Sequence, residues 1–301
     1  MKRKLIVLFA ALVATRLLAA PAAPRVSARD SEGRLVELAA SAGRIVSLSP
    51  AATEVLFAIG AGSLVCGDTE FCDYPVAALA IPKIGGFAAK TISVELILEL
   101  RPNLVVSSGS MHRQIEEQLT RYSIPVFSYD PGDFDGIARD MRALGVLTGT
   151  TSTAEAAVSA MLASLESIAK RIAPLAPADR PTVFWEMYDE PLTTCGWATF
   201  QHAIIAAAGG RDIFEDLHGS WPTVSSEEVI RRAPDYIVGA DDHGDKLSVA
   251  QIVARPGWAS VPAVRSGRVV LVPADLVSRP TPRIAEGVAA VAYALHPGLF
   301  P

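Results

Sequence analysis

The stretch TSTAEAAVSAMLASLESIAKRIAP, from Thr151 to Pro174, decides the fold of this 301-residue chain. Its apolar residues recur three to four positions apart, the spacing of one buried stripe on an α-helix. They are Ala154, Ala157, Val158, Met161, Leu162, Leu165, Ile168, Ala169 and Ile172. The pattern predicts a single helix over Ser152–Ala173, about 33 Å long at 1.5 Å per residue. This helix lies at the middle of the chain, with similar lengths of sequence on either side.

Both ends and the outer face of this helix carry further signals. Ser152 and Glu155 fit a capping box, in which two side chains satisfy free amides at a helix start. Glu166 and Lys170 are four residues apart, the spacing of an ion pair on one helix face. Pro174 predicts where the helix ends.

On both sides of the central helix, short apolar runs alternate with helical patterns. The predicted strands are 45–48, 64–67, 104–107, 126–127, 182–187, 236–238 and 269–272. The predicted helices are 53–59, 93–100, 115–122, 137–148, 200–208, 227–232 and 284–295. A hairpin with Gly33 near its turn is expected at Asp30–Leu38. Such alternation is typical of parallel α/β sheets.

Two segments repeat each other across the chain. ISVELILELRPNLVV, ending at Val106, matches VSSEEVIRRAPDYIV, ending at Val238, at a constant offset of 132 residues. Both predict a serine cap, a short helix, a proline break and a buried strand, which indicates an architectural duplication. We therefore predict two Rossmann-like α/β lobes with parallel sheets, joined by a single long backbone helix. The expected divisions are a signal peptide at 1–22, an N-terminal lobe at 23–150, the helix at 151–174 and a C-terminal lobe at 175–301.

The first residues resemble a secretory signal. A basic start (Lys2, Arg3 and Lys4), an apolar run and the small residues Ala20-Pro21-Ala22 follow in order. A retained anchor is the alternative, although the run is short for a membrane span. Removal of the signal leaves 23 basic and 32 acidic residues, a balance of −9. We expect a periplasmic, monomeric protein whose acidic surface does not favour nucleic acid as a partner.

The three cysteines leave two interpretations open. An exported compartment is oxidising, and Cys66 and Cys72 are close enough in sequence to bridge a small loop. Alternatively, these two thiols and Cys195 are buried as small apolar groups.

In open parallel sheets, ligands bind beyond the carboxyl ends of the strands. The loops so selected are 49–50, 68–73, 107–112, 185–191, 239–245 and 274–279. An aromatic residue precedes each repeated serine cap, Phe87 in one half and Trp221 in the other. At a cleft, such side chains suit a large planar ligand; the alternative is that both lie in the core.

The order of several motifs resembles one family. They are RIVSLSPAATEVLFAIG, DYP, the run from IGGF to PNLVV, AAAGGRDIF, SWPTVSSEEVIRRAPDYIV and RPTPRIAEG. Together, over residues 44–297, they resemble the periplasmic cobalamin-binding proteins of ABC importers. More broadly, they are similar to the helical-backbone metal-chelate receptors, which also bind haem and ferric siderophores. The resemblance implies two lobes with little hinge motion and a chelate delivered to a permease dimer in the inner membrane.

The resemblance also implies roles for particular residues. Those implied to contact the ligand are Phe71, Phe87, Trp221, Asp275, Leu276, Val277, Ser278 and Arg279. Phe71 stands where the cobalamin receptors have a tyrosine, Leu276-Val277 replaces an aromatic pair, and Phe87 stands where haem receptors offer a tyrosine. Cobalamin or a related corrinoid is therefore the expected ligand, with haem or a ferric siderophore as the alternative.

Glu95 and Glu227 match the glutamates with which the cobalamin receptors dock onto permease arginines. The residues themselves leave a second interpretation open, because acidic side chains at helix starts also compensate the helix dipole.

Metal-site and enzyme motifs give no strong signal. His112, His218 and His243 follow strands or precede Trp221 and could ligate a chelated metal, but solvated loop histidines are more common. Asp241, Asp242, His243 and Asp245 could form a hard metal site or an exposed acidic loop. No nucleophile elbow, zinc-protease, phosphate-loop or dinucleotide motif is present in the sequence. We expect a binding protein and not an enzyme, without a resident metal ion or cofactor; a secreted cleft enzyme is the competing class.

Overall fold

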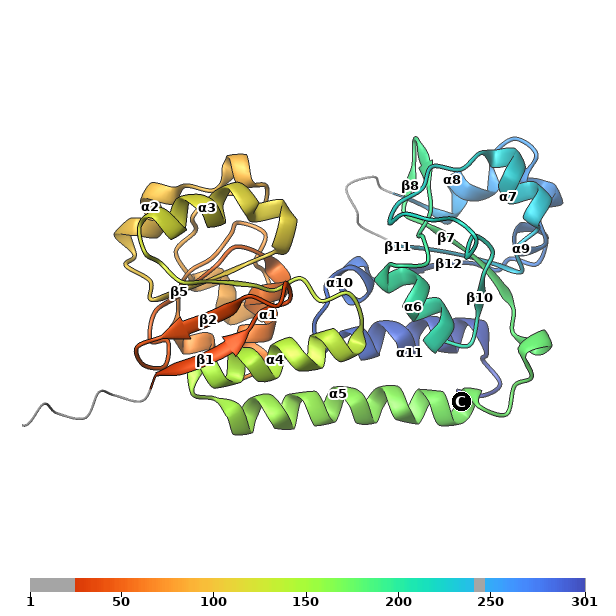
Figure 1. Ribbon diagram of the computed structural model, residues 1–301. Helices are drawn as coiled ribbons and strands as arrows, with labels where there is room; N and C mark the ends of the chain where they lie inside the picture. The colour runs from red at the N-terminus through yellow and green to blue at the C-terminus, as the bar shows by residue number, and fades with distance from the viewer. Residues whose placement is uncertain (1–24, 241–246, 301) are drawn as a thin grey trace, which may run out of the picture.

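The computed structural model describes residues 25–240 and 247–300. The predicted central helix is confirmed as α5 (Thr151–Ile172). In Figure 1 this helix runs unbroken along one side of two separate lobes. It packs against α4 (Phe134–Thr148) of the first lobe and α11 (Ile284–Leu295) of the second. The long helix is therefore the backbone of the molecule.

The capping box predicted at the start of α5 is wrong. Thr150 occupies the cap position, but its side chain makes no capping hydrogen bond to the helix backbone, and Glu155 pairs instead with Arg142 of α4 at 2.6 Å. The reason is that α4 ends at Gly149, whose φ of 74° turns the chain directly into α5. The two helices are then antiparallel neighbours, and Glu155 reaches across to the other helix. The predicted Glu166–Lys170 pair is present at 2.7 Å.

The N-terminal lobe is built on a parallel four-stranded sheet in the order β4-β3-β5-β6. Its strands are β3 (Ile45–Ser47), β4 (Val65–Gly67), β5 (Leu104–Ser107) and β6 (Val126–Ser128), preceded by the expected hairpin of β1 (Val26–Arg29) and β2 (Leu35–Leu38). Besides α4, its helices are α1 (Pro50–Ala58), α2 (Val94–Glu99) and α3 (Arg113–Arg121). Short 3-10 turns at 62–64, 76–80, 89–91 and 109–112 complete the lobe.

The C-terminal lobe repeats this plan with the order β10-β7-β11-β12. Its strands are β7 (Thr182–Glu186), β10 (Arg211–Asp212), β11 (Tyr236–Ala240) and β12 (Val269–Val272), with a small hairpin of β8 (Tyr188–Asp189) and β9 (Leu192–Thr193). Its helices before α11 are α6 (Phe200–Ala207), α7 (Ser226–Arg232), α8 (Val249–Val253), α9 (Pro262–Arg265) and α10 (Ala274–Ser278), with 3-10 turns at 177–179 and 258–260. In chain order both sheets read second, first, third, fourth, so the predicted duplication is confirmed.

The local signals of the duplication are also confirmed. The hydroxyl oxygens of Ser93 and Ser225 accept from backbone amides at 3.2 Å and cap α2 and α7. Differences from the predicted elements are confined to short pieces. The segment 274–279, expected as a loop, contains α10, and the two-residue strand β10 was not predicted.

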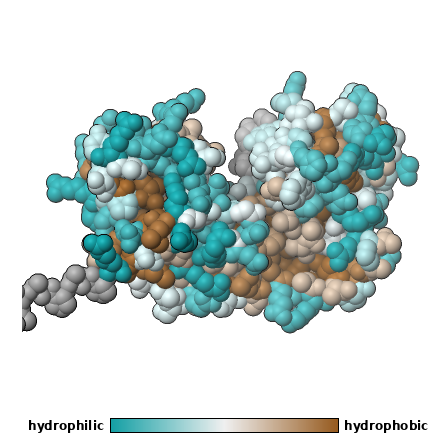
Figure 2. All heavy atoms as spheres, viewed as in Figure 1, coloured by the Kyte–Doolittle hydropathy of each residue, from teal (hydrophilic) through white to brown (hydrophobic). Residues whose placement is uncertain are grey.

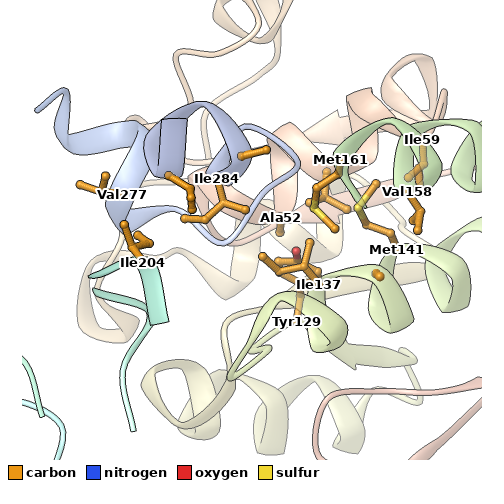
Figure 3. Close-up of a cluster of buried hydrophobic side chains, with 14 of the residues drawn as sticks. Ala52, Ile59, Tyr129, Ile137, Met141, Val158, Met161, Ile204, Val277 and Ile284 are labelled. Atoms are coloured by element: carbon orange, nitrogen blue, oxygen red, sulfur yellow. The ribbon is translucent and has the colours of Figure 1, made fainter. Parts of the chain in front are cut away.

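A single apolar core runs through both lobes. One cluster of buried side chains includes Ile45 of the first sheet, Val158 and Met161 of α5, and Val183 of the second sheet. Figure 3 shows Val158 and Met161 of α5 in one cluster with side chains of both lobes, among them Ala52 of the first lobe and Ile284 of the second. Each sheet also has one smaller apolar cluster on its other face. The lobes are therefore not independent globules, because they share buried surface beneath the backbone helix.

We expect Met161→Ala to destabilise the whole protein by about 2–5 kcal/mol, because it opens a cavity in the shared core. All four tryptophans belong to the C-terminal lobe. Urea unfolding followed by tryptophan fluorescence and by far-ultraviolet circular dichroism should therefore give one coincident transition, shifted together in the variant. Ser159→Ala, on the exposed face of α5, is the matched control. Two separate transitions would contradict the shared core.

Candidate functional site

The loops at the carboxyl ends of the two sheets face each other. Arg279, which follows α10 after β12, lies 2.8 Å from Asp73, in the loop after β4. Tyr129, just after β6, donates its hydroxyl proton to the carbonyl oxygen of Pro280 at 2.5 Å. Figure 2 shows the surface hollowed between the two lobes. The binding position predicted by the strand-end rule is therefore an open inter-lobe cleft.

Buried charges close one side of this cleft. The carboxylate of Glu54 on α1 accepts from Arg279 at 2.7 Å and from Arg283 at 3.3 Å. Arg279 also pairs with Asp275 at 2.8 Å, and the guanidinium of Arg283 lies 3.9 Å from the ring centre of Tyr74. We call Glu54, Asp73, Arg279 and Arg283 the inter-lobe bridge.

Electrostatics within the inter-lobe bridge depend on both of its arginines. Burial raises the pKa of the Glu54 carboxyl, and the hydrogen bond from Arg279 and the charge of Arg283 oppose that rise. For the less buried Asp73, burial is outweighed by Arg279, so its pKa is lowered. Loss of the Glu54 carboxylate would remove the ion pair of the partly buried Arg283, whereas Arg279 would keep its pairs with Asp73 and Asp275.

A small cavity of about 280 Å³ opens beside the inter-lobe bridge. It is lined by Glu54, Phe57, Ala58, Tyr74, Pro75, Pro282 and Arg283. Small-molecule sites commonly enclose about 300–1,000 Å³. The cavity is thus too small for a large ring-shaped ligand, and the inter-lobe cleft is the candidate site.

Phe71 and Phe87 lie on the N-terminal side of the cleft. Phe71 is 57% exposed and Phe87 is half-buried. The buried ring of His112 holds the Phe87 segment: its Nδ1 accepts from the Ser108 amide at 2.9 Å, and its Nε2 donates to the Phe87 carbonyl at 2.8 Å. Burial lowers the pKa of His112, which favours the neutral ring. The metal-ligand interpretation of His112 is therefore wrong, because both ring nitrogens are occupied.

Two exposed tryptophans lie on the C-terminal side. The segments 193–196 and 220–223 pair through backbone hydrogen bonds, from Gly196 to Ser220 at 2.9 Å and from Thr194 to Pro222 at 3.1 Å. Trp197 and Trp221 follow from this pairing on neighbouring segments, 54% and 47% exposed. Sequence reasoning missed Trp197, although it precedes the Thr199 cap of α6 just as Trp221 precedes a serine cap.

The residues from Asp275 to Arg279 do not all face the same surroundings: two pack in or against the core, one is held in ion pairs and two are partly exposed. Val277 is fully buried in the shared core, so its inclusion among side chains that contact the ligand is wrong. Leu276 is half-buried against the same core. The guanidinium of Arg279 is 15% exposed and engaged by three carboxylates. Asp275 and Ser278, both partly exposed, remain candidates for polar contact.

The disulfide considered for Cys66 and Cys72 is not formed, and both thiols are free. The Cys72 sulfur lies 3.1 Å from the Thr53 hydroxyl and 3.2 Å from the Thr69 hydroxyl. Cys66 packs against the apolar cluster on the other face of the sheet. Burial raises the pKa of the Cys72 thiol, as it does for Cys195. The alternative of buried thiols therefore describes Cys72 and Cys195.

Glu95 and Glu227 occupy equivalent positions in the first turns of α2 and α7, and both are exposed. Figure 1 shows these two helices far from α5, one on each lobe. Glu95 accepts a hydrogen bond from Ser93 at 3.1 Å. Next to Glu227, Glu228 is the carboxylate that pairs with Arg231 and Arg232. The two matched glutamates thus point from two corresponding exposed helix starts.

Within residues 25–240 and 247–300, no group of three or more histidine, cysteine, aspartate or glutamate side chains is placed to hold a metal ion. The acidic positions Asp241, Asp242, His243 and Asp245 lie outside the described residues, as does the predicted signal at 1–22. Among the described helices, none is long and apolar enough to cross a membrane.

Two like lobes over an open cleft, held by a backbone helix, define a two-lobed binding protein. A sequence profile of the periplasmic binding protein family matches residues 45–276, and the chain belongs to this family.

Proteins similar in sequence show which kind of binding protein this chain is. The chain is 31% identical to the vitamin B12-binding protein of Salmonella paratyphi A over 81% of its own length and 86% of the relative's. It is 28% identical to YvrC of Bacillus subtilis, an ABC transporter substrate-binding lipoprotein, over 91% and 87%. This chain is thus a substrate-binding protein of an ABC transporter, in the superfamily that binds B12, haem and siderophores.

Solved structures agree with this fold. The crystal structure of the vitamin B12-binding protein BtuF of Vibrio cholerae superposes with a TM-score of 0.73 at 25% identity, covering 86% of this chain and 99% of that one. The haem-binding protein RhuT of a Roseiflexus species superposes with a TM-score of 0.75 at 24% identity, over 86% and 99%. Such similar scores for different cargoes mean that the backbone does not decide the ligand.

We expect Glu54→Ala to destabilise the protein by about 3–5 kcal/mol, because it removes the buried carboxylate that pairs with Arg283 and one of the three that pair with Arg279. Glu54→Gln keeps the side-chain volume and should retain most of this loss, which separates charge from cavity effects. The exposed Glu166→Ala, which breaks an ion pair on α5, should change stability by no more than about 0.5 kcal/mol. Urea denaturation measures all three. Equal stabilities of the Glu54 and Glu166 variants would show that the bridge contributes little.

Proposed function

We propose that this protein binds cobalamin or a related corrinoid in the inter-lobe cleft and delivers it to an ABC permease. The observation that carries the proposal is the set of aromatic side chains at the facing strand ends: exposed Phe71 and half-buried Phe87 on one lobe, exposed Trp197 and Trp221 on the other. Aromatic faces bury large areas against flat apolar ligands with little loss of rotamer entropy. The overall similarity to B12-binding relatives supports the same ligand class.

We assign the polar contacts with the ligand to Asp275 and Ser278, which are partly exposed on α10. A corrinoid carries amide groups around its ring; the Asp275 carboxylate can accept hydrogen bonds from them, and the Ser278 hydroxyl can accept or donate. Arg279 contributes indirectly: its three ion pairs hold the seam between the lobes and so set the spacing of the cleft walls.

Haem or a ferric siderophore is the second candidate, supported by the shared fold of haem-binding structures. Against haem stands Phe87, which offers no oxygen ligand to iron where a tyrosine is expected in the haem receptors. A cleft enzyme is the competing class; turnover of a bound candidate would favour it.

Export through residues 1–22 and docking through Glu95 and Glu227 complete the proposal. One carboxylate on each lobe would form a two-point charge contact with a dimeric permease. Such exposed charges chiefly set orientation and association rate.

The test is to titrate the purified protein with cyanocobalamin, haemin and ferric siderophores and to measure each affinity by isothermal titration calorimetry. We expect cyanocobalamin to bind most tightly. If no chelate binds below about 10 µM, which is weak for a dedicated receptor, the proposed carrier function is wrong.

Removing the aromatic walls should weaken that binding. Trp197→Ala and Trp221→Ala should each lower cyanocobalamin affinity by roughly tenfold or more, the usual effect of truncating a buried aromatic contact. Tyr293→Ala removes a comparably exposed aromatic side chain from α11 and is the matched control. Calorimetry is suited to this series because the variants alter tryptophan fluorescence itself. Unchanged affinity in both tryptophan variants would place the ligand elsewhere.

The docking proposal separates binding from transport. A double variant, Glu95→Ala with Glu227→Ala, should keep its cyanocobalamin affinity and lose most uptake in cells that depend on this protein. The control double variant, Glu99→Ala with Glu215→Ala, removes one exposed carboxylate from each lobe away from the helix starts. Normal uptake by the first variant would reduce Glu95 and Glu227 to helix-start residues.

A further inference from the structure

The histidines of the chain are not equivalent in their hydrogen bonding. Both ring nitrogens of His112 are engaged; His202 contacts Asp212 at 3.0 Å; His296 contacts the Gly209 carbonyl at 3.2 Å. His218 is exposed, and within residues 25–240 and 247–300 no hydrogen bond occupies its ring nitrogens. Of the described histidines, His218 is therefore the one that can still bind a ligand through either nitrogen.

His218 also lies at the aromatic wall of the C-terminal lobe. Its ring is edge-on to Trp197, with ring centres 6.5 Å apart and planes at 88°. Three residues later in the same loop comes Trp221, and the loop follows β10 at the carboxyl edge of the sheet. The imidazole thus belongs to the same short stretch of wall as the two exposed tryptophans.

Backbone geometry brings these side chains together. A Cβ atom at position 196 would lie 1.8 Å from the carbonyl oxygen of Gly219, so the two segments approach as closely as glycine allows. Gly219 itself has a φ of 103°, a conformation that side-chain-bearing residues rarely adopt. This close approach holds the segment of His218 next to the segment of Trp197, where their rings are in contact.

We propose that His218 ligates the metal of the bound chelate through one imidazole nitrogen. This proposal rests on the proposed corrinoid function. It adds that the protein prefers a corrinoid whose metal carries a labile axial ligand. Neutral imidazole is a good ligand for the transition metal held in such a chelate. In the step, the bond between the metal and an axial water breaks and a metal–nitrogen bond forms. The water leaves to solvent, and the oxidation state of the metal does not change.

A chelate whose axial position is already blocked cannot make this bond. Cyanocobalamin, which holds its cyanide firmly, should bind through ring contacts alone, whereas aquocobalamin should bind through ring contacts and the imidazole. His218 would therefore act as a selectivity residue between forms of the same vitamin.

The experiment compares wild type and His218→Ala, each titrated with aquocobalamin and with cyanocobalamin. We expect His218→Ala to lose roughly tenfold or more in affinity for aquocobalamin, a loss of about 1.4 kcal/mol per tenfold, with little change for cyanocobalamin. The absorption spectrum of bound aquocobalamin should show replacement of water by nitrogen in wild type and not in the variant. Free imidazole added to the variant should restore that spectrum. Ser220→Ala, a nearby exposed change, is the control.

The outcomes separate the two proposals. If cyanocobalamin binds and His218→Ala matches wild type in affinity and spectrum with aquocobalamin, ligation by His218 is wrong and the carrier function stands. Equal losses for both corrinoids would also overturn ligation, because they indicate a packing role. If neither corrinoid binds, the same two proteins are titrated with haemin: a six-coordinate spectrum lost in His218→Ala supports ligation with a different cargo, and its absence overturns it.

Discussion

The apolar core shared by both lobes is the constraint on which the rest of this structure depends. Met161 and Val158 of α5 lie in one buried cluster with Ile45 of the first sheet and Val183 of the second. Opening the lobes by a large rotation would pull this cluster apart and expose apolar side chains, at about 25 cal/mol for each Å². The cleft is therefore preformed, and a ligand enters a space whose width is already set. Such preorganisation lowers the entropy lost on binding.

Ion pairs between the lobes add to the apolar core in fixing how the lobes are placed. The inter-lobe bridge joins Glu54 of one lobe to Arg279 and Arg283 of the other, beside the cleft. Buried ion pairs contribute less net stability than their Coulomb attraction suggests, since both partners lose water. Their directional hydrogen bonds, however, specify one relative placement of the lobes, which apolar packing alone specifies less sharply. This explains why Arg279, in a segment implied to touch the ligand, has its guanidinium committed to protein carboxylates.

Periodic features of the fold and contacts between residues close in sequence could be predicted, whereas contacts between distant elements could not. The 22-residue helix α5 and the repeated Ser–Glu–Pro segments carry several signals each, so their positions were right to within a few residues. The strand β10 has two residues and no period to detect. The capping role predicted for Glu155 was wrong because its carboxylate pairs with Arg142, which belongs to the preceding helix and is near only in space. Val277 is buried in the core because its segment forms the helix α10, which the loop prediction lacked. Trp197 was missed because a threonine cap, not a serine, follows it.

Ligand identity in such a fold depends on side chains that the backbone merely presents. B12-binding and haem-binding structures superpose on this chain almost equally well. The pairing of 193–196 with 220–223 is made by main-chain atoms and by the close approach of Gly196 to Gly219, so it does not depend on which side chains stand at 197, 218 and 221. Those positions can change without disturbing the strands beneath. A scaffold of this kind separates folding from recognition: the shared core and the bridge fix the positions of the two lobes, and the proposed recognition depends on a few exposed rings that these contacts do not involve.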